Sequence, residues 1–455
     1  MKVAFIGGGS LRLLPLLRGI MGNTPQAFAN SELRFIDLKR DRAEAVAAMV
    51  KASPEFSKVD SCTISCPANT DEGLKDIDVL YLTMAARREP EETQALFLAH
   101  EYGLHASDQL TPNGAFLSMR LGPVILNLAR KLEVLSPNAL MLIFPNPVAV
   151  YSAMVNTFTK IRAIGICGGF NNHRWDLTRA LLGRHEFDPK WNVVAAGINH
   201  LSFILRGDYM GEDLYSSLCP RIYGPDPAPC KIGELGGWVL YESYRRYGKM
   251  IFSSELDGFA HIFPDFAHEW RAKRLASLQP FDPASYGKAW ANEMEQRFSD
   301  FMKNAENAAD FDWDNPPDPE LYQKSITDIS LPIFKALAKI EPMRIVATRP
   351  NNGAVAGFPD KMAMEYTMDI FGSEITPVAD QYVPAPFHGL CASLGEFQTL
   401  LAQALAERNP ELFAFALESY PVQQFTNKRR EFFCRMFDLY RDIDPEMQKA
   451  RKFFE

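Results

Sequence analysis

Short apolar runs alternate with helically spaced segments over the first 200 positions of this 455-residue chain. Runs rich in Val, Ile and Leu, with little alternation of polar residues, are typical of strands that are covered on both faces of a parallel sheet. The expected strands are residues 3–7, 33–37, 79–83, 140–144, 163–167 and 193–199. Helical spacing appears between them, for example at 40–50 and 123–135. The pattern predicts an α/β domain of the Rossmann type, with crossover helices, over residues 1–200.

The pattern changes after residue 201. A proline-rich, loop-like stretch at 219–231 precedes helical segments at 232–247 and 284–303. An acidic segment with prolines, 307–319, is typical of an exposed connection, and 344–347 has the character of a strand. The tail from 395 to 454 is mostly helical in its spacing. We therefore expect residues 201–455 to form a mixed α+β, helix-rich domain for substrate binding and oligomerisation.

Glycines follow the first predicted strand directly. The strand leads into Gly7-Gly8-Gly9-Ser10, and helical spacing follows at 11–21. Glycine suits this place because the backbone must turn tightly and let a pyrophosphate approach the amides at the start of the helix. The G-x-G-x-x-G pattern is incomplete, since Arg12 stands at the third glycine position.

A carboxylate at the end of the second strand adds weight to the glycine turn. Asp37 can accept bonds from the adenosine ribose hydroxyls and disfavour a 2′-phosphate, although it can also simply cap the helix that begins near Lys39. Turn and carboxylate together predict NAD, rather than NADP, as the cofactor. The predicted cofactor-binding residues are Gly7, Gly8, Gly9, Ser10, Asp37, Thr83 and Asn146.

Three further strand ends carry candidate chemistry. Asn146-Pro147 follows an apolar strand, where Asn146 can bond the nicotinamide ribose or a substrate hydroxyl, or can belong to an ordinary turn. Cys167 and His200 end two other strands, and a thiolate and an imidazole at neighbouring strand ends can share a divalent metal. The alternatives are a buried thiol and a structural histidine.

Charge and cysteine content narrow the class of protein. The net charge is −8, with both signs mixed along the chain, so no basic stripe indicates a nucleic-acid partner. No apolar run approaches the roughly 20 residues of a membrane helix, and the glycines from Gly7 arrive too early for a signal-peptide core. The seven cysteines are scattered and odd in number, which favours a reducing cytoplasm over a disulfide framework.

Several of these segments, taken in order, resemble the family 4 glycoside hydrolases, which are distant relatives of lactate and malate dehydrogenases. The resemblance spans nearly the whole chain. It rests on the opening 3–10, on 108–116 ahead of Arg120, on Asn146-Pro147, on Cys167, on the block 199–202, and on 351–355 followed by Phe358-Pro359-Asp360.

The resemblance implies a glycosidase that works by transient oxidation and elimination, unlike the usual two-carboxylate enzymes. NAD takes a hydride from carbon 3 of the sugar and so acidifies the proton on carbon 2. A metal, usually manganese, on Cys167 and His200 polarises the ketone. A base removes the carbon 2 proton, the aglycone leaves, water adds, and the hydride returns. Possible substrates are an α-glycoside or a uronide, and a homo-oligomer (dimer or tetramer) is expected.

The chain departs from the family pattern after the metal cysteine. Cys167 is followed by Gly168-Gly169-Phe170, where characterised branches carry Cys-His, or Cys-Asn or Cys-Asp with a nearby proline. Either this chain belongs to another substrate branch, or His173 reaches the site across a short insertion; the alternative for His173 is an exposed residue at the start of a helix.

The catalytic base is expected in the irregular region 248–266 or shortly before it. Asp257 is the first candidate, Tyr241 and Tyr244 are its rivals, and His261 is a candidate substrate contact. Core packing is the alternative role for the two tyrosines.

Arginines offer further substrate contacts. If two of Arg87, Arg88 and Arg120 converge, an anionic sugar such as a uronide is favoured; the alternative is that they pair with Glu89, Glu91 and Glu92. Two rival functions remain open. One is a 2-hydroxy-acid dehydrogenase, which would need a Gly-x-His-Gly-Asp setting that this sequence does not contain. The other is a non-catalytic NAD-binding sensor.

Overall fold

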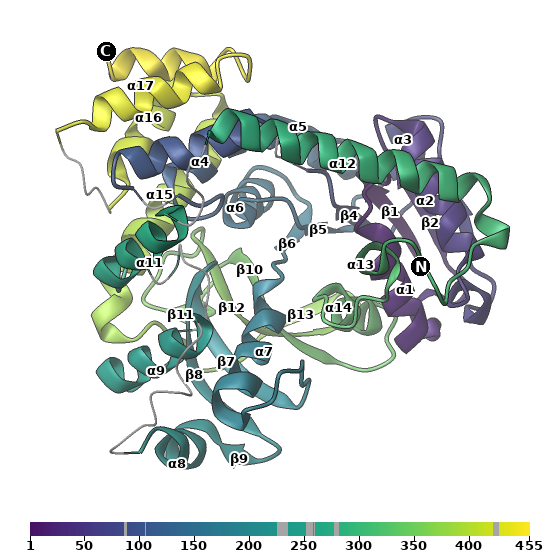
Figure 1. Ribbon diagram of the computed structural model, residues 1–455, viewed down its shortest axis with the longest axis horizontal. Coiled ribbons are helices and arrows are strands. Elements are labelled where there is room, and N and C mark those ends of the chain that lie inside the picture. The colour runs from purple at the N-terminus through teal and green to yellow at the C-terminus, as the bar shows by residue number, and fades with distance from the viewer. Residues whose placement is uncertain are drawn as a thin grey trace.

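The computed structural model describes residues 1–85, 89–104, 106–224, 235–251, 258, 260–276, 282–421 and 427–455. The side chains of 170–173, 235, 236, 271 and 274–276 are not described. Within the described residues, twelve strands form one mixed sheet that crosses the molecule, with the order β3-β2-β1-β4-β5-β6-β10-β12-β7-β8-β9 and β13 beside β12 (Figure 1).

The first six strands of this order are parallel. Their bounds are β1 (Lys2–Ile6), β2 (Glu32–Ile36), β3 (Thr63–Ser65), β4 (Val79–Leu82), β5 (Leu140–Ile143) and β6 (Arg162–Gly165). The order 3-2-1-4-5-6 is that of dinucleotide-binding α/β folds. Every residue of β4 and β5 is buried, as their continuous apolar runs predict. The predicted Rossmann-type fold class is therefore confirmed.

The remaining strands are antiparallel and extend the same sheet. They are β7 (Trp191–Ile198), β8 (Leu201–Tyr209), β9 (Glu212–Asp213), β10 (Met343–Pro350), β12 (Ala363–Phe371) and β13 (Glu374–Pro377). A separate parallel pair joins β11 (Val355–Ala356) to β14 (Gln381–Tyr382). Because β10 and β12 lie between β6 and β7, two strands that follow each other in the chain are separated in the sheet.

The helices of the first half are α1 (Leu13–Asn23), α2 (Arg40–Ala52), α3 (Thr70–Leu74), α4 (Glu91–Glu101), α5 (Pro112–Leu135), α6 (Val148–Phe158) and α7 (Gly169–Leu182). Of these, α2, α3 and α6 pack against parallel strands, whereas α4 packs mainly against α12 and α17 of the second half. The eight residues from Val148 to Val155 in α6 are all buried. A helix that is apolar on every side belongs to a core, and α6 packs against β6, β10 and the C-terminal helix α15.

The other α-helices of the described residues belong to the second half, which the sequence predicts to be rich in helices. They are α8 (Cys219–Tyr223), α9 (Leu235–Tyr247), α11 (Pro264–Ala276), α12 (Pro283–Glu306), α13 (Pro319–Tyr322), α14 (Ser330–Leu337), α15 (His388–Glu407), α16 (Pro410–Ser419) and α17 (Arg429–Leu439). The long helix α12 runs from α4 to α2 along one side of the molecule (Figure 1). It is fixed to α2 by an ion pair between Arg42 and Glu295 at 2.6 Å.

A candidate cofactor and metal site at the strand ends

The turn from β1 into α1 leaves no room for side chains. Gly7 has a φ of 84°, and a Cβ at this position would lie 2.6 Å from the backbone nitrogen of Met84. A Cβ at Gly8 would lie 2.6 Å from the nitrogen of Ile36. Both glycine amides donate to the carbonyl of Ile36, at 3.0 and 2.9 Å. Glycine is therefore required here by the close approach of the ends of β2 and β4.

Asp37 links this turn to the next helix. Its Oδ2 accepts a hydrogen bond from Gly9 N at 2.9 Å, and its Oδ1 accepts one from Lys39 N at 2.9 Å. Both roles considered for this residue are compatible with the geometry, because each carboxylate oxygen keeps a further lone pair for a ribose hydroxyl. Thr83, at the end of β4, is buried and donates its amide to the carbonyl of Ile6 at 2.9 Å.

Arg12 explains the missing third glycine. Its guanidinium lies 3.6 Å from the centroid of the Phe144 ring and donates to Tyr81 Oη at 2.7 Å. It also forms an ion pair with Asp328, which lies ahead of α14. The side chain thus ties α1 to the ends of β4 and β5 and to the second half of the chain, a role that glycine cannot fill.

Asn146 is held in one orientation by two neighbours. Its Nδ2 donates to Asp108 Oδ2 at 2.8 Å, and its Oδ1 accepts from Gln109 Nε2 at 2.5 Å. Gln109 is fixed in turn, since its Oε1 accepts from Val148 N at 3.1 Å. The sequence did not single out Asp108 and Gln109 for this role; the signal was the segment 108–116 that carries part of the family resemblance.

Cys167 and His200 are brought together although their strands are not neighbours. Cys167 follows β6, His200 occupies the turn between β7 and β8, and Cys167 Sγ lies 3.4 Å from His200 Nε2. Gly169 N, at the start of α7, donates to Cys167 Sγ at 3.5 Å. His200 is buried and Cys167 is half-buried.

The separation suits a shared divalent ion. With zinc as the guide, bonds of about 2.3 Å to sulfur and about 2.05 Å to nitrogen would place the two atoms about 3.1 Å apart at a right angle and about 3.6 Å apart at the tetrahedral angle. The observed 3.4 Å lies between these values. Among the described residues, no group of three or more His, Cys, Asp or Glu side chains could hold a metal. A two-residue site leaves coordination positions for substrate and water.

A buried carboxylate lies beside the His200 turn. Glu365 Oε2 accepts from Asn199 Nδ2 at 2.7 Å, and Glu365 Oε1 accepts from Ser202 Oγ at 2.9 Å. Burial raises the pKa of Glu365 above its usual range. This residue could not be found from the sequence, because a single Glu in a strand carries no pattern. Asn199 Oδ1 is buried and accepts no hydrogen bond from the described part of the chain.

The candidate bases differ in their surroundings. Tyr241 and Tyr244, on α9, pack with Tyr223 at ring-centroid distances of 5.1 and 5.9 Å, and Tyr244 stacks on Tyr215 at 6.2 Å. Burial raises the pKa of Tyr244. Asp257 lies outside the described residues.

The candidate substrate contacts are only partly described. Arg120, on α5, pairs with Glu92 at 3.3 Å, which is the alternative role considered for one of the arginines. His261 Nε2 lies 2.9 Å from the buried Tyr420 Oη. Arg87, Arg88 and the side chain of His173 lie outside the described part of the structure.

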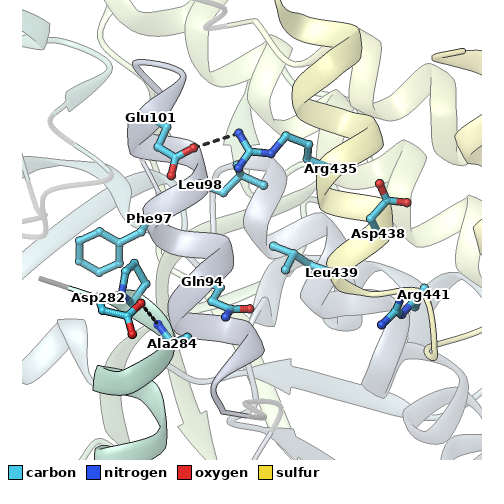
Figure 2. A pocket seen from close by; sticks show the side chains of 11 residues that line it. Gln94, Phe97, Leu98, Glu101, Asp282, Ala284, Arg435, Asp438, Leu439 and Arg441 are labelled. Carbon is cyan, nitrogen blue, oxygen red and sulfur yellow. Dashed lines mark hydrogen bonds and ion pairs between the residues drawn. The ribbon is translucent and has the colours of Figure 1, made fainter.

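A separate pocket of about 440 Å³ lies between α4, the start of α12 and α17 (Figure 2). Arg435 forms an ion pair with Glu101 at 2.9 Å across it, and Asp282 caps α12 through Ala284 N at 3.2 Å. None of the predicted cofactor, metal or catalytic residues lines this pocket.

Within the described residues, each helix is too short or too polar to cross a membrane.

The strand order and the glycine turn define a Rossmann-type α/β protein of the dinucleotide-binding class. Comparison with sequence families then identifies the branch. The family model for family 4 glycosyl hydrolases matches residues 2–182. The model for the C-terminal domain of the same family matches residues 195–422. The chain belongs to the family 4 glycosyl hydrolases, which confirms the resemblance found in its sequence.

The relatives that match this chain are named for different sugars. An alpha-galactosidase of Bacillus subtilis (strain 168) is 25% identical over 68% of this chain and 67% of its own length. An alpha-galacturonidase of Thermoanaerobacter italicus is 21% identical over 97% of this chain and 96% of its own. A 6-phospho-beta glucosidase structure from Thermotoga maritima, with manganese, NAD+ and glucose-6-phosphate, is 17% identical and has a TM-score of 0.74, covering 97% of this chain and 99% of its own.

Proposed function

We propose that this chain is a glycosidase that uses NAD and a divalent metal ion, manganese being the best supported, to cleave its substrate by transient oxidation and elimination. The observation that carries the proposal is the 3.4 Å approach of Cys167 Sγ to His200 Nε2 from two strands that are not neighbours. Family membership supports it, as does the Thermotoga maritima structure that contains manganese and NAD+.

The first-half strand ends would hold the NAD. Gly7, Gly8, Gly9 and Ser10 let the pyrophosphate reach the backbone, while Asp37 accepts bonds from the adenosine ribose and Thr83 lines the end of β4. Bound NAD supplies a reversible hydride acceptor for carbon 3 of the sugar. Asn146, whose amide is fixed by Asp108 and Gln109, presents a preset orientation to a ribose or sugar hydroxyl.

Cys167 and His200 would hold the metal. A bound divalent ion supplies Lewis-acid polarisation of a carbonyl at carbon 3 and so acidifies the neighbouring proton. Ligation would require the thiolate form of Cys167, whose Sγ accepts a hydrogen bond from the Gly169 amide.

Asp257 is the proposed base that removes the carbon 2 proton. A tyrosine base must be a phenolate when it acts, and the raised pKa of Tyr244 opposes this. The packing of Tyr241 and Tyr244 against Tyr223 gives both tyrosines a structural role. We assign His261 to the substrate side only through its place in the same region, since its ring is engaged with Tyr420.

The sugar is proposed to be an α-glycoside or a uronide. Arg120 is engaged by Glu92, so recognition of a sugar carboxylate would fall mainly to Arg88. The α-galactosidase and α-galacturonidase relatives support these two classes. We further propose a homo-oligomer and a reducing cytoplasmic location, which keeps Cys167 reduced; the six described cysteines are free thiols.

The test is hydrolysis of a panel of nitrophenyl glycosides, uronides and 6-phosphoglycosides, with and without NAD and Mn²⁺. Activity that requires both additions is expected, and Cys167→Ser should abolish it, whereas Cys434→Ser, a half-buried thiol on α17, should not. Activity without NAD, or with full rate in Cys167→Ser, would refute the proposal. Net NADH production from lactate or malate would favour the dehydrogenase instead.

A further inference from the structure

His200 occupies a backbone conformation that its own side chain disfavours. It lies in the two-residue turn between Ile198 and Leu201, which pair across β7 and β8, and its φ is 67°. This left-handed region suits glycine and is uncommon for other residues, although histidine occurs there more often than most. Contacts beside the turn that hold this conformation also hold the direction in which the His200 ring points.

Glu365 makes contact with both sides of that turn. One carboxylate oxygen accepts from Asn199 Nδ2 at 2.7 Å, immediately before His200, and the other accepts from Ser202 Oγ at 2.9 Å, two residues after it. The carboxylate thus bridges the residues that flank the turn and uses one oxygen for each.

In the strand order, Glu365 on β12 lies between β6, which leads to Cys167, and β7, which leads to His200. A row of directly paired residues runs across the strands, from Gly165 through Thr348, Glu365 and Gly197 to Ser202. Directly paired residues point to the same face of a sheet. Cys167 follows Gly165 at one end of the row, and His200 lies beyond Gly197 toward the other end.

Glycine in this row lets the hairpin close tightly. A Cβ at Gly197 would lie 2.3 Å from the carbonyl oxygen of Leu201 and 2.4 Å from Ser202 Cα. The close approach brings Ser202 within reach of Glu365. The bridge therefore depends on the register of β7, β8 and β12 together. Through it, the position of β12 fixes the position of the His200 turn.

Packing alone does not account for a carboxylate at this position. Glu365 is buried, and both of its hydrogen-bond donors are neutral groups, an amide and a hydroxyl. A buried carboxylate is costly even with the His200 ring close enough to interact with its charge, and an apolar residue of the same volume would pack at lower cost. A glutamate at this position can accept both hydrogen bonds at once, one with each carboxylate oxygen.

We propose that Glu365 is a positioning residue that holds the His200 turn, and so sets the distance from His200 Nε2 to Cys167 Sγ and the affinity of the pair for a divalent metal. The inference rests on the proposed function, because it takes Cys167 and His200 to be the metal ligands. Loss of partners that orient a metal-bound histidine typically weakens metal binding by roughly 10–100-fold.

The test measures Mn²⁺ affinity directly, by electron paramagnetic resonance of free Mn²⁺ with NAD present and no sugar. Glu365→Met keeps the volume but removes both acceptors, and it should weaken Mn²⁺ binding by roughly 10–100-fold while NAD affinity is unchanged. Glu365→Gln can still contact both partners, so it should restore most of the affinity. Equal losses in the two variants would overturn a positioning role.

A control on the same strand separates metal binding from general stability. Thr367 Oγ1 accepts a hydrogen bond from Ala195 N at 2.8 Å and donates one to Ala195 O at 3.1 Å. Thr367→Val therefore weakens the contact between β12 and β7 away from the turn. It should lower thermal stability without changing Mn²⁺ affinity; an equal loss of affinity would contradict the proposal.

Two further comparisons keep the outcomes distinct. Should Glu365→Met fail to fold, Ser202→Ala removes one of the two bridges and should weaken Mn²⁺ binding, and unchanged affinity would overturn the inference. Wild-type affinity in Cys167→Ser and His200→Ala would instead refute the metal site itself. Lost affinity in those two variants, with none lost in Glu365→Met, would refute only the role of Glu365.

Discussion

Alanine at Gly7 tests the close backbone approach on which the proposed NAD turn depends. The φ of Gly7 is 84°, and a Cβ there would meet Met84 N at 2.6 Å and Thr83 C at 2.8 Å. A left-handed conformation costs an L-residue about 1–2 kcal/mol. Forcing a methyl group into packed backbone adds about 1–3 kcal/mol. Gly7→Ala should therefore lower the free energy of unfolding by about 2–5 kcal/mol.

Gly183 provides a matched control. It ends α7 with a φ of 66°, but a Cβ there would have no neighbour within 4 Å. Gly183→Ala should thus lose only the conformational part, about 1–2 kcal/mol. Urea unfolding, followed by circular dichroism, measures both changes. Isothermal titration with NAD should show weaker binding for Gly7→Ala alone, because the contact displaces the end of β4.

Equal losses of unfolding free energy in the two variants would refute the close approach as the reason for glycine at Gly7. Unchanged NAD affinity in a clearly destabilised Gly7→Ala would show that the turn does not belong to the NAD site.

Three further substitutions probe other parts of the account. Asp37→Ala removes the acceptor of two backbone amides, so stability should fall by about 1–3 kcal/mol and NAD affinity should fall with it in calorimetry; unchanged affinity would contradict the NAD assignment. Gln109→Leu removes the donor to Asn146 Oδ1 and leaves Asp108 alone to orient that amide, so kcat should fall by about 10–100-fold in the glycoside assay; an unchanged kcat would show that this orientation is not used. Burial raises the pKa of Glu55, but hydrogen bonds and charge from Arg18 outweigh it and hold that pKa below the usual 4.5. The stability that Glu55 contributes is therefore present above pH 4.5 and is lost as the pH falls through the folded-state pKa. Glu55→Gln should lower the free energy of unfolding by about 3–5 kcal/mol at neutral pH. The loss measured by urea unfolding should be smaller near pH 4. A difference that does not depend on pH would contradict the ion pair.

The parallel half of the sheet could be predicted because its strands are buried on both faces. β4 and β5 are unbroken apolar runs, and the predicted ends differ from the observed ends by one residue. β12 escaped prediction because Glu365, Thr367 and Asp369 interrupt its apolar pattern although most of the strand is buried. β8 was missed because the Asn199-His200 turn lacks the glycine that usually marks a two-residue hairpin.

The members of the candidate metal pair could be named from sequence, but their distance could not. Each follows an apolar strand, which places it at a strand end. Their separation depends on β10 and β12, which come from much later in the chain and enter the sheet between β6 and β7. Glu365 belongs to one of these inserted strands, so its contact with the His200 turn exists only once the sheet is assembled.

The environment of Asn146 was predictable in kind rather than in detail. Its place at a strand end indicated a ligand contact, whereas the amide of Gln109 and the carboxylate of Asp108 reach it from the loop ahead of α5. Arg120 shows a similar case. Only the later part of its helix was predicted, at 123–135, whereas α5 begins at Pro112, and only the fold reveals that Glu92 lies 3.3 Å from the Arg120 guanidinium.

The central claim is that the glycosidic bond breaks by elimination after removal of the proton on carbon 2. Turnover of an accepted glycoside in D₂O, with NAD and Mn²⁺ present, tests it through the nuclear magnetic resonance spectrum of the released sugar. The account predicts deuterium at carbon 2 of the product, since the abstracted proton exchanges with solvent before it is returned. A product that keeps its original hydrogen at carbon 2, formed at the same rate without NAD, would show direct hydrolysis and contradict the account.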